Sequence, residues 1–327
     1  MDEFALIDRF FASRVADSMH DREDVRVGIG DDAAVTHIDS GSELVIATDT
    51  LVEGTHFIAG TPAHALGHRC LAVNLSDIAA MGAEPLWCTL ALTLPEGSAD
   101  WVDRFSVGLL TLANAHDVAL IGGDTTRGPL SVTVTMHGRV APGAAVLRDG
   151  AAPGQGIYVT GRVGGAAAGL ALVQGANDDM TLLQSDLVRR FLYPVPRVAE
   201  GRALSGLASA MIDVSDGLNV DLSRLLRASG VGAELSIESL PIDAKTVERF
   251  GRVRAIDFAL SGGDDYELCF TVPAEAEERL RRAASTWSCE ISRIGETVSG
   301  SDIAWREHGR AFSVSDSSFR HFEQEAP

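Results

Sequence analysis

Hydrophobic residues recur along this chain with two spacings, one of about 3.6 residues and one of two, so both helices and strands are expected. Residues 4–15 place large apolar side chains on one helical face, whereas residues 130–140 alternate between apolar and polar side chains as a strand does. For the first half of the chain, the pattern predicts helices over 4–15, 62–82 and about 101–112, and strands over 43–48, 86–94 and 130–140.

The same mixture returns after residues 141–156, a stretch rich in glycine and proline that is the best candidate for a domain boundary. The elements predicted beyond it are strands over 157–160, 210–213 and 267–272, and helices from Gly164 and over 181–192, 197–208 and 220–229. At 327 residues the chain is longer than one domain usually needs. We therefore expect an α/β or α+β protein with two domains, residues 1–142 and 143–327.

Charge and composition narrow the class of protein. The net charge of −19, from 27 basic and 46 acidic residues, argues against nucleic acid or an anionic membrane as a partner. No stretch approaches the roughly 20 apolar residues of a membrane span, and the acidic start lacks the pattern of a signal peptide. Four scattered cysteines, without a Cys-x-x-Cys pair, are typical of thiols in a reducing cytoplasm. A cytoplasmic enzyme is expected.

One acidic element recurs through the chain: an Asp or an Asp pair beside Gly, Ser or Thr, near the end of a predicted strand or helix. It occurs in residues 28–32, 47–50, 74–77, 122–126, 213–217 and 261–265. If these carboxylates converge, two charges about 4 Å apart repel by roughly 4 kcal/mol at an effective dielectric near 20, so cations must offset them. Hard oxygen ligands suit Mg²⁺, which completes its shell with water and phosphates. The pattern predicts a Mg²⁺–nucleotide site.

The single lysine limits how such a site can handle ATP. Lys245 lies far from any glycine-rich loop, which excludes a Walker A loop and a protein-kinase site, because both place a lysine on the phosphates. No Gly-x-Ser-x-Gly elbow or Cys/His pair supports covalent catalysis. His64 and His68 are placed on the outer face of their helix, and only His56 is retained as a substrate contact.

Each acidic segment also has a simpler interpretation. Residues 28–32 can be a polar turn between strands 25–27 and 33–38, and Asp77 can lie on the solvated face of its helix. Residues 122–128 can be a hairpin-type loop, although glycines, an acid and an arginine together favour a phosphate contact. Ser215 can be a helix N-cap, and a helix start is also a natural anion site.

Six segments together closely resemble the thiamine-monophosphate kinases. They are residues 28–35, 47–57, 71–85, 120–128, 212–218 and 260–268, and the match runs in order over about residues 4–300. The resemblance implies transfer of the γ-phosphate of ATP onto thiamine monophosphate, which gives thiamine diphosphate. It also implies the two-domain fold of aminoimidazole ribonucleotide synthetase, with an N-terminal sheet that pairs across a homodimer.

The resemblance also implies a set of site residues. The Mg²⁺ ligands, for several ions, are expected to be Asp32, Thr48, Asp49, Asp77, Asp124, Asp213 and Asp216. The ATP contacts are expected to be Gly123, Asp124, Arg148 and Ser215. His56 and Asp264 are expected to contact the thiamine phosphate.

Three positions depart from the family's pattern. Ala47 stands where Ser often precedes Thr-Asp-Thr, and His116 stands where an aromatic residue often packs near adenine. Asp316 occupies the place of an expected Trp against the thiamine rings, with Phe319 nearby. We expect thiamine monophosphate to be used all the same, with its ring held by other contacts.

The expected mechanism is direct, metal-assisted transfer without a protein nucleophile. An acceptor phosphate is already ionised at neutral pH, so no general base is needed. Two enzymes of the same fold are alternatives: a selenophosphate synthetase would need a reactive cysteine near the first glycine-rich loop, and a hydrogenase-maturation enzyme would end in a cysteine-bearing tail. The first cysteine here is Cys70, and the last five residues contain none. A non-catalytic binder of divalent cations is a further alternative, but no EF-hand loop is present.

Overall fold

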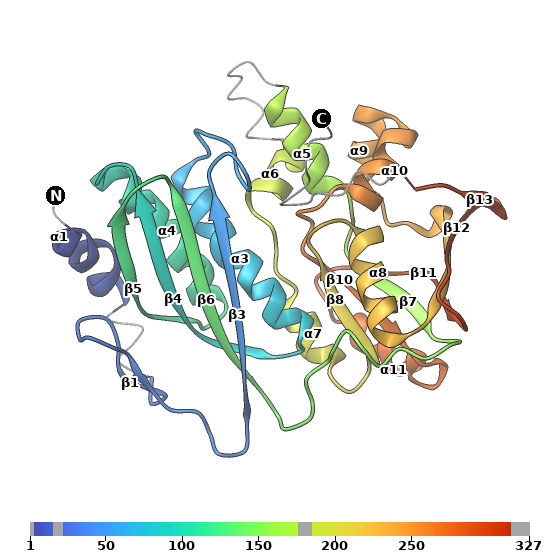
Figure 1. Ribbon diagram of the computed structural model, residues 1–327, viewed down its shortest axis with the longest axis horizontal. Helices are drawn as coiled ribbons and strands as arrows, with labels where there is room; N and C mark the ends of the chain where they lie inside the picture. The colour runs from blue at the N-terminus through green and yellow to red at the C-terminus, as the bar shows by residue number, and fades with distance from the viewer. Residues whose placement is uncertain (1–2, 16–21, 176–184, 315–327) are drawn as a thin grey trace, which may run out of the picture. The chain divides into compact units, whose positions relative to one another are not determined.

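A computed structural model describes residues 3–15, 22–175 and 185–314 of the chain. The chain forms two compact units, one made of residues 1–78 and 82–145 and the other of residues 79–81 and 146–327. Each unit combines helices with a β-sheet, which confirms the predicted α/β class (Figure 1). No helix among the described residues is both long and apolar enough to span a membrane.

The first unit is built on a four-stranded sheet in the order β3-β6-β4-β5. Its strands are β3 (Glu43–Val52), β4 (Glu84–Leu94), β5 (Ala119–Arg127) and β6 (Ser131–Val140). β4 and β5 are parallel, and the other two pairs are antiparallel. Every second residue of β6 is buried, as the alternation in the sequence predicted. The sheet therefore has one covered face and one open face.

Helices α3 (Ala63–Ala80) and α4 (Ala99–Ala115) cover one face of this sheet (Figure 1). The two helices cross closely because each has a glycine at the contact. A Cβ atom on Gly67 would lie 2.0 Å from the Phe105 carbonyl oxygen, and one on Gly108 would lie 2.0 Å from the His64 carbonyl oxygen. The glycines therefore allow backbone-to-backbone packing that no other residue permits.

A short ribbon packs near one end of this sheet. It consists of β1 (Val25–Val27) and β2 (Val35–Thr36), which pair antiparallel. Apolar side chains of the ribbon and its flanks pack on β4 and β5 in a small second core of Val25, Ala34, Ile38, Leu86, Trp87, Ala119 and Ile121. A helical segment precedes the ribbon, formed by α1 (Glu3–Ile7) and a π-helical turn, η1 (Asp8–Ala12).

The second unit contains a seven-stranded sheet in the order β13-β12-β9-β11-β7-β10-β8. Its strands are β7 (Gly156–Thr160), β8 (Ala210–Val214), β9 (Gly232–Ser236), β10 (Glu267–Val272), β11 (Ile291–Val298), β12 (Ile303–Glu307) and β13 (Arg310–Phe312). All pairs are antiparallel except β12 with β9. Every residue of β7, β8 and β10 is buried, so both faces of the sheet are covered there.

The second unit also contains helices. They are α5 (Gly165–Gln174), α6 (Asp186–Leu192), α7 (Val198–Leu204), α8 (Leu218–Ser229), α9 (Ala244–Phe250), α10 (Arg252–Ser261) and α11 (Glu277–Ala284), with short 3-10 turns η3 (Ile237–Ser239) and η4 (Ala274–Ala276). The buried leucines of α8 join the core formed by β7, β8 and β9. The sequence pattern predicted neither α9 to α11 nor β9 and β11 to β13, because these elements have short or mixed apolar repeats.

Candidate functional site

Two of the expected N-terminal site residues lie on the open face of the first sheet. Asp124 on β5 is in register with Ala91 of β4, and Ala91 in turn with Thr133 of β6. Thr48 on the far edge strand is opposite Thr135, and its hydroxyl donates to the Thr135 hydroxyl at 3.1 Å. Three strand spacings separate β3 from β5, which amounts to about 14 Å. The sheet therefore places Thr48 and Asp124 on one face but not side by side.

Asp49 faces the other way. It is opposite the fully buried Val134, on the face that the helices cover. Its backbone N–H donates to Oδ1 of Asn74 on α3 at 3.1 Å, and Asn74 is fixed by donating from Nδ2 to the Cys70 carbonyl at 2.9 Å. Asp77, one turn further along α3, is half-buried rather than fully solvated. Asn74 was not among the expected site residues, although it stands three positions before Asp77 in residues 71–85, one of the segments that resemble the family.

The glycine-acid segment after Ile121 continues a strand and is not a hairpin-type loop, because β5 extends to Arg127. The pairing of β4 with β5 shifts by one residue after Cys88, which makes a β-bulge just before Gly122. Gly123 has φ +154°, and a Cβ atom there would lie 1.9 Å from the Leu90 carbonyl oxygen. Only glycine fits this position, so its occurrence in the sequence has a steric cause.

The acidic loop, residues 28–32, reaches the same place on β5. Ile29 of this loop lines a cavity of about 50 Å³ together with Gly122, Gly123, Asp124 and Thr125. Within the loop, the Asp32 N–H donates to Oδ1 of Asp31 at 2.8 Å. The side chains of Asp32 and Asp124 are both exposed, and neither has a hydrogen-bond or ion-pair partner within the described part of the chain. These two carboxylates are therefore available to a ligand.

His56 follows β3 and is held by its own backbone. The Val52 N–H donates to Nδ1 of His56 at 3.0 Å. Nδ1 is thus an acceptor, which leaves Nε2 as the nitrogen that carries a proton. The ring is therefore oriented as an N–H donor, which is the form that suits a phosphate oxygen.

In the second unit, Asp213 lies near the end of β8, and a tight turn between β8 and α8 carries Ser215 and Asp216. Ser215 does not cap the helix, because α8 begins after Gly217. The carboxylate of Asp221 instead accepts the N–H groups of Ser215 and Asp216 at 3.0 and 2.9 Å. Burial raises the pKa of Asp221 to about 7, and the nearby charge of Asp213 adds to this effect. Any contact of Ser215 with a ligand must therefore use its hydroxyl.

An arginine balances part of this negative charge. Nη1 of Arg224 donates to Asp216 at 2.6 Å and to Asp221 at 2.7 Å. Neither Arg224 nor Asp221 was among the expected site residues. One feature could have pointed to Asp221. It stands five residues after Asp216, on the face of α8 that is buried.

The loop that carries Asp264 is bonded to this turn. The Asp264 N–H donates to the Ser215 carbonyl at 2.8 Å, and the Tyr266 N–H donates to the Val214 carbonyl at 2.9 Å. Asp264 and Tyr266 have φ of 69° and 51°, a region that costs a side chain free energy. The structure therefore brings Ser215, Asp216 and Asp264 together on adjacent segments.

The next two acids along the chain have structural contacts. Asp265 accepts the N–H groups of Gly164 and Ala166 at 2.6 and 3.2 Å and so caps α5, and its burial raises its pKa to about 7. Glu267 forms a two-point ion pair with Arg197, with both distances 2.6 Å. Asp265 and Glu267 therefore anchor the chain immediately after Asp264.

The remaining expected residues are less informative. Arg148 is exposed, and its carbonyl accepts from the Ser229 hydroxyl at 3.1 Å. Lys245 pairs with Asp186 at the start of α6. Asp316 and Phe319 lie outside the described residues.

The described residues offer oxygen donors to a metal ion but no preformed cluster of metal ligands. In residues 3–15, 22–175 and 185–314, no three His, Cys, Asp or Glu side chains are grouped so as to hold a metal ion. The unpartnered carboxylates of Asp32 and Asp124 are hard oxygen ligands of the kind that Mg²⁺ prefers. Mg²⁺ commonly uses one or two carboxylates and takes its other ligands from water and phosphates. The residues present therefore fit Mg²⁺ bound together with a nucleotide.

Comparison with known proteins places this chain in a family. The family models "AIR synthase related protein, N-terminal domain" and "AIR synthase related protein, C-terminal domain" match residues 30–140 and 152–306. Thiamine-monophosphate kinase of Salmonella typhimurium LT2 is 50% identical over 297 residues, which cover 90% of each chain.

Two solved structures extend the likeness to the fold. The crystal structure of thiamine-monophosphate kinase from Stenotrophomonas maltophilia K279a has a TM-score of 0.86 and 45% identity, and covers 95% of this chain and 98% of its own. AaThiL complexed with AMPPCP and TMP has a TM-score of 0.75 and 29% identity, with 98% and 97% covered. By sequence and by fold, this chain belongs to the thiamine-monophosphate kinase family.

Proposed function

We propose that this protein phosphorylates thiamine monophosphate to thiamine diphosphate with ATP, by direct transfer assisted by Mg²⁺. The observation that carries the proposal is two unpartnered carboxylates, Asp124 next to Gly123 on β5 and Asp32 on the loop whose Ile29 lines a cavity with that part of β5. The proposal is also supported by sequence, because this chain is 50% identical to a thiamine-monophosphate kinase. A relative of the same fold was solved with AMPPCP and TMP.

Asp32 and Asp124 are proposed to bind Mg²⁺ that also contacts the phosphates of ATP. Bound Mg²⁺ would screen the repulsion between the two phosphate-bearing substrates and stabilise charge on the transferring group. Thr48, Asp49 and Asp77 are proposed as further ligands. Asp213 and Asp216 have the same proposed role in the second unit. Because Arg224 donates to Oδ2 of Asp216, a metal ion would bind this carboxylate through its other oxygen, Oδ1.

Three residues are proposed to contact ATP in addition to Asp124. Gly123 has no side chain, so the backbone of β5 is accessible to a phosphate oxygen. Ser215 is proposed to contact ATP through its hydroxyl, since Asp221 already accepts its N–H. Arg148 is proposed to reach a phosphate with its exposed guanidinium.

The acceptor is proposed to contact His56 and Asp264. The Nε2–H of His56 is a donor for a phosphate oxygen. The acceptor phosphate is already ionised at neutral pH, so the residues need only hold it in line with the γ-phosphate. No protein nucleophile and no general base are required.

A homodimer and a cytoplasmic location are part of the proposal. β3 is a ten-residue edge strand, and its Leu44 and Ile46 are 46% and 57% exposed. A long edge strand with exposed apolar side chains is suited to pairing with a second copy. Leu44→Asp combined with Ile46→Asp should convert a dimer to a monomer in light scattering, and an unchanged mass would rule out this edge.

The test of the function is a direct assay. Protein is incubated with Mg²⁺, ATP and thiamine monophosphate, and thiamine species are separated by chromatography. Thiamine diphosphate and ADP should form in equal amounts, and thiamine without a phosphate should not be converted. The substrate assignment fails if no thiamine diphosphate appears while another phosphate acceptor is turned over.

A further inference from the structure

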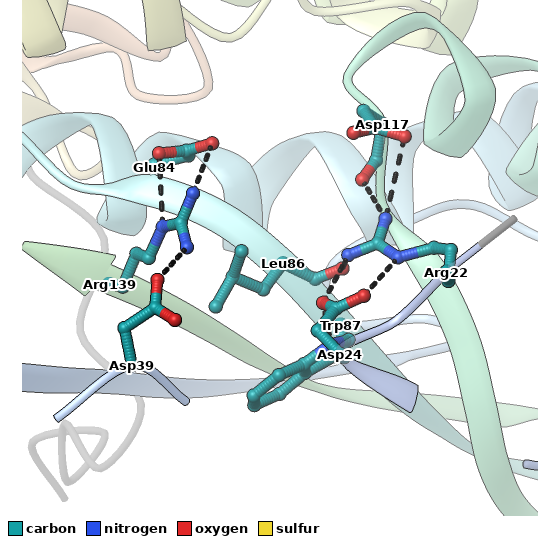
Figure 2. A network of polar contacts seen from close by, with 8 residues as sticks. All are labelled: Arg22, Asp24, Asp39, Glu84, Leu86, Trp87, Asp117 and Arg139. Atoms are coloured by element: carbon teal, nitrogen blue, oxygen red, sulfur yellow. Dashed lines mark hydrogen bonds and ion pairs between the residues drawn. The ribbon is translucent and has the colours of Figure 1, made fainter. Parts of the chain in front are cut away.

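The β1–β2 ribbon, residues 22–39, is attached to the first sheet by two arginine-centred clusters of polar contacts (Figure 2). One cluster lies just before β1 and the other just after β2. Between the two strands of the ribbon lies the acidic loop with Asp32. The two clusters therefore flank the loop in the sequence, and they attach the strands on both sides of it to the sheet.

The first cluster is centred on Arg22 and Asp24. The Arg22 guanidinium donates to both carboxylate oxygens of Asp24, at 2.8 and 2.6 Å. It also donates to the carbonyl oxygens of Asp117 and Leu86, at 2.6 and 3.3 Å. The indole N–H of the buried Trp87 donates to Asp24 at 2.6 Å. Asp24 thus connects the ribbon to β4, and Arg22 connects it to the turn before β5 (Figure 2).

The second cluster holds the other end. Arg139 of β6 donates to Asp39 at 3.1 Å and to both carboxylate oxygens of Glu84, at 3.2 and 3.3 Å (Figure 2). Its members are more exposed than Arg22, whose side chain is 12% exposed against 35% for Arg139. The first cluster is therefore the better shielded of the two, and its hydrogen bonds are less exposed to competition from water.

The acidic loop has few contacts of its own to hold it in place. Gly28 and Gly30 interrupt it, and Gly30 has φ +122°. The side chain of Asp32 contacts no partner within the described residues, while Ile29 rests against the β5 segment that carries Asp124. A flexible loop can present its carboxylate in one place only if its ends are fixed. The ribbon clusters provide that restraint.

We propose that Asp24, held by Arg22 and Trp87, is a positioning residue that sets the place of Asp32 for Mg²⁺–nucleotide binding. This inference rests on the proposed function, because it needs Asp32 to be a metal ligand. It adds to that function the statement that a residue without contact to the metal determines the affinity of the protein for Mg²⁺. The effect requires the ribbon to hold the loop, not merely to cover the apolar patch on β4 and β5.

Three variants test the proposal with a readout other than turnover. Trp87→Phe keeps an aromatic ring in the apolar patch but removes the indole N–H. Asp24→Asn keeps one carbonyl acceptor, and Asp24→Ala removes both. Calorimetry with Mg²⁺ and the non-hydrolysable analogue AMPPCP should show Mg²⁺ affinity about fivefold weaker for Trp87→Phe, the effect of one lost hydrogen bond, and weaker still for Asp24→Ala. Asp24→Asn should lie between wild type and Asp24→Ala.

A purely structural role predicts a different result. Partial unfolding would lower the number of binding sites per chain and leave the affinity of each site unchanged. The positioning role predicts full stoichiometry with weaker affinity, and turnover that recovers at saturating Mg²⁺. Asp100→Asn, which breaks an exposed ion pair with Arg104 on α4, is the matched control and should behave as wild type.

A double-mutant cycle separates this inference from the proposed function. Asp32→Asn alone should weaken Mg²⁺ binding, and adding Asp24→Ala should weaken it no further, because the two residues act through one contact. Full additivity, or unchanged affinity in both Asp24→Ala and Trp87→Phe, would overturn the positioning role while leaving Asp32 as a ligand. Unchanged affinity in Asp32→Asn would overturn both.

Discussion

At the scale of single residues, the acids of this chain have two kinds of environment. Asp32 and Asp124 are exposed and have no partner within the described residues. Asp221 and Asp265 are buried and satisfy backbone N–H groups. The first kind is free to bind a ligand, and the second kind holds the segments on which ligand-binding residues stand. Asp32 and Asp265 are each the second Asp of a Gly-Asp-Asp sequence, so for these two acids the environment and not the motif makes the difference.

Asp124→Asn should lower turnover at least about a hundredfold, because metal positioning contributes several kcal/mol to transition-state stabilisation. The fold should survive, since the side chain is exposed on an otherwise intact strand. The check is the rate at saturating Mg²⁺ together with the melting temperature. Asp302→Asn, an exposed acid in the second unit, serves as the control. Near-normal turnover would remove Asp124 from the metal ligands.

At the scale of elements, helix α5 depends on a residue outside it. Its N-cap position is Gly164, which has no side chain, and Asp265 from a distant loop accepts the N–H groups of Gly164 and Ala166. The cap therefore couples the helix to the loop that carries Asp264. The sequence pattern predicted the helix and marked the acidic loop separately. It did not show that Asp265 of the loop caps the helix.

Asp265→Ala should lower the free energy of unfolding by about 1–2 kcal/mol, the effect of losing a helix cap. Urea denaturation measures it. Ser98→Ala, which removes a cap on α4 whose hydrogen bond is 3.4 Å long, should cost less. Equal effects of the two substitutions would show that Asp265 adds nothing beyond an ordinary cap.

The contribution of the β1–β2 ribbon to the stability of the fold depends on pH. The hydrogen bonds from Arg22, and then from Trp87, hold the pKa of Asp24 below its ordinary value of 3.8, against the opposing effect of burial. Since the folded pKa is lower than the unfolded pKa, Asp24 stabilises the fold above pH 3.8. This contribution is lost as the pH falls through the lowered pKa.

Asp24→Asn should therefore flatten the acid side of the stability curve. Wild type should lose more unfolding free energy than Asp24→Asn between about pH 5 and about pH 3, as measured by urea denaturation at each pH. Parallel curves for the two proteins would contradict the assigned pKa direction.

At the scale of the whole molecule, charge decides how ATP can bind. A protein with a net charge of −19 and one lysine offers little to offset the charge of a nucleotide. ATP binding should therefore collapse when EDTA removes divalent cations. Calorimetric titration of ATP with and without EDTA measures this, and undiminished affinity would show that the protein's own arginines suffice.

Much of the fold was predictable because it depends on local patterns. The alternation over β6 and the helical repeats of α3 and α4 appear in the sequence as they do in the structure. Residues 122–127 were not seen as part of a strand, because two glycines and an acid have low strand propensity. Their strand conformation depends on pairing with β4, and a β-bulge and a positive φ at Gly123 accommodate it.

By itself, the sequence determined the mixed α/β class, the recurring acids beside glycines and the family to which they point, since these depend on neighbouring residues alone. Only the tertiary structure decided that Asp221 and Asp265 bind backbone N–H groups, that Thr48 lies opposite Thr135, and that Asp24 contacts Trp87. The physical reason is that the partners lie far apart in the chain. Trp87 is 63 residues from Asp24, and Gly164 is 101 residues from Asp265, so no local pattern could pair them.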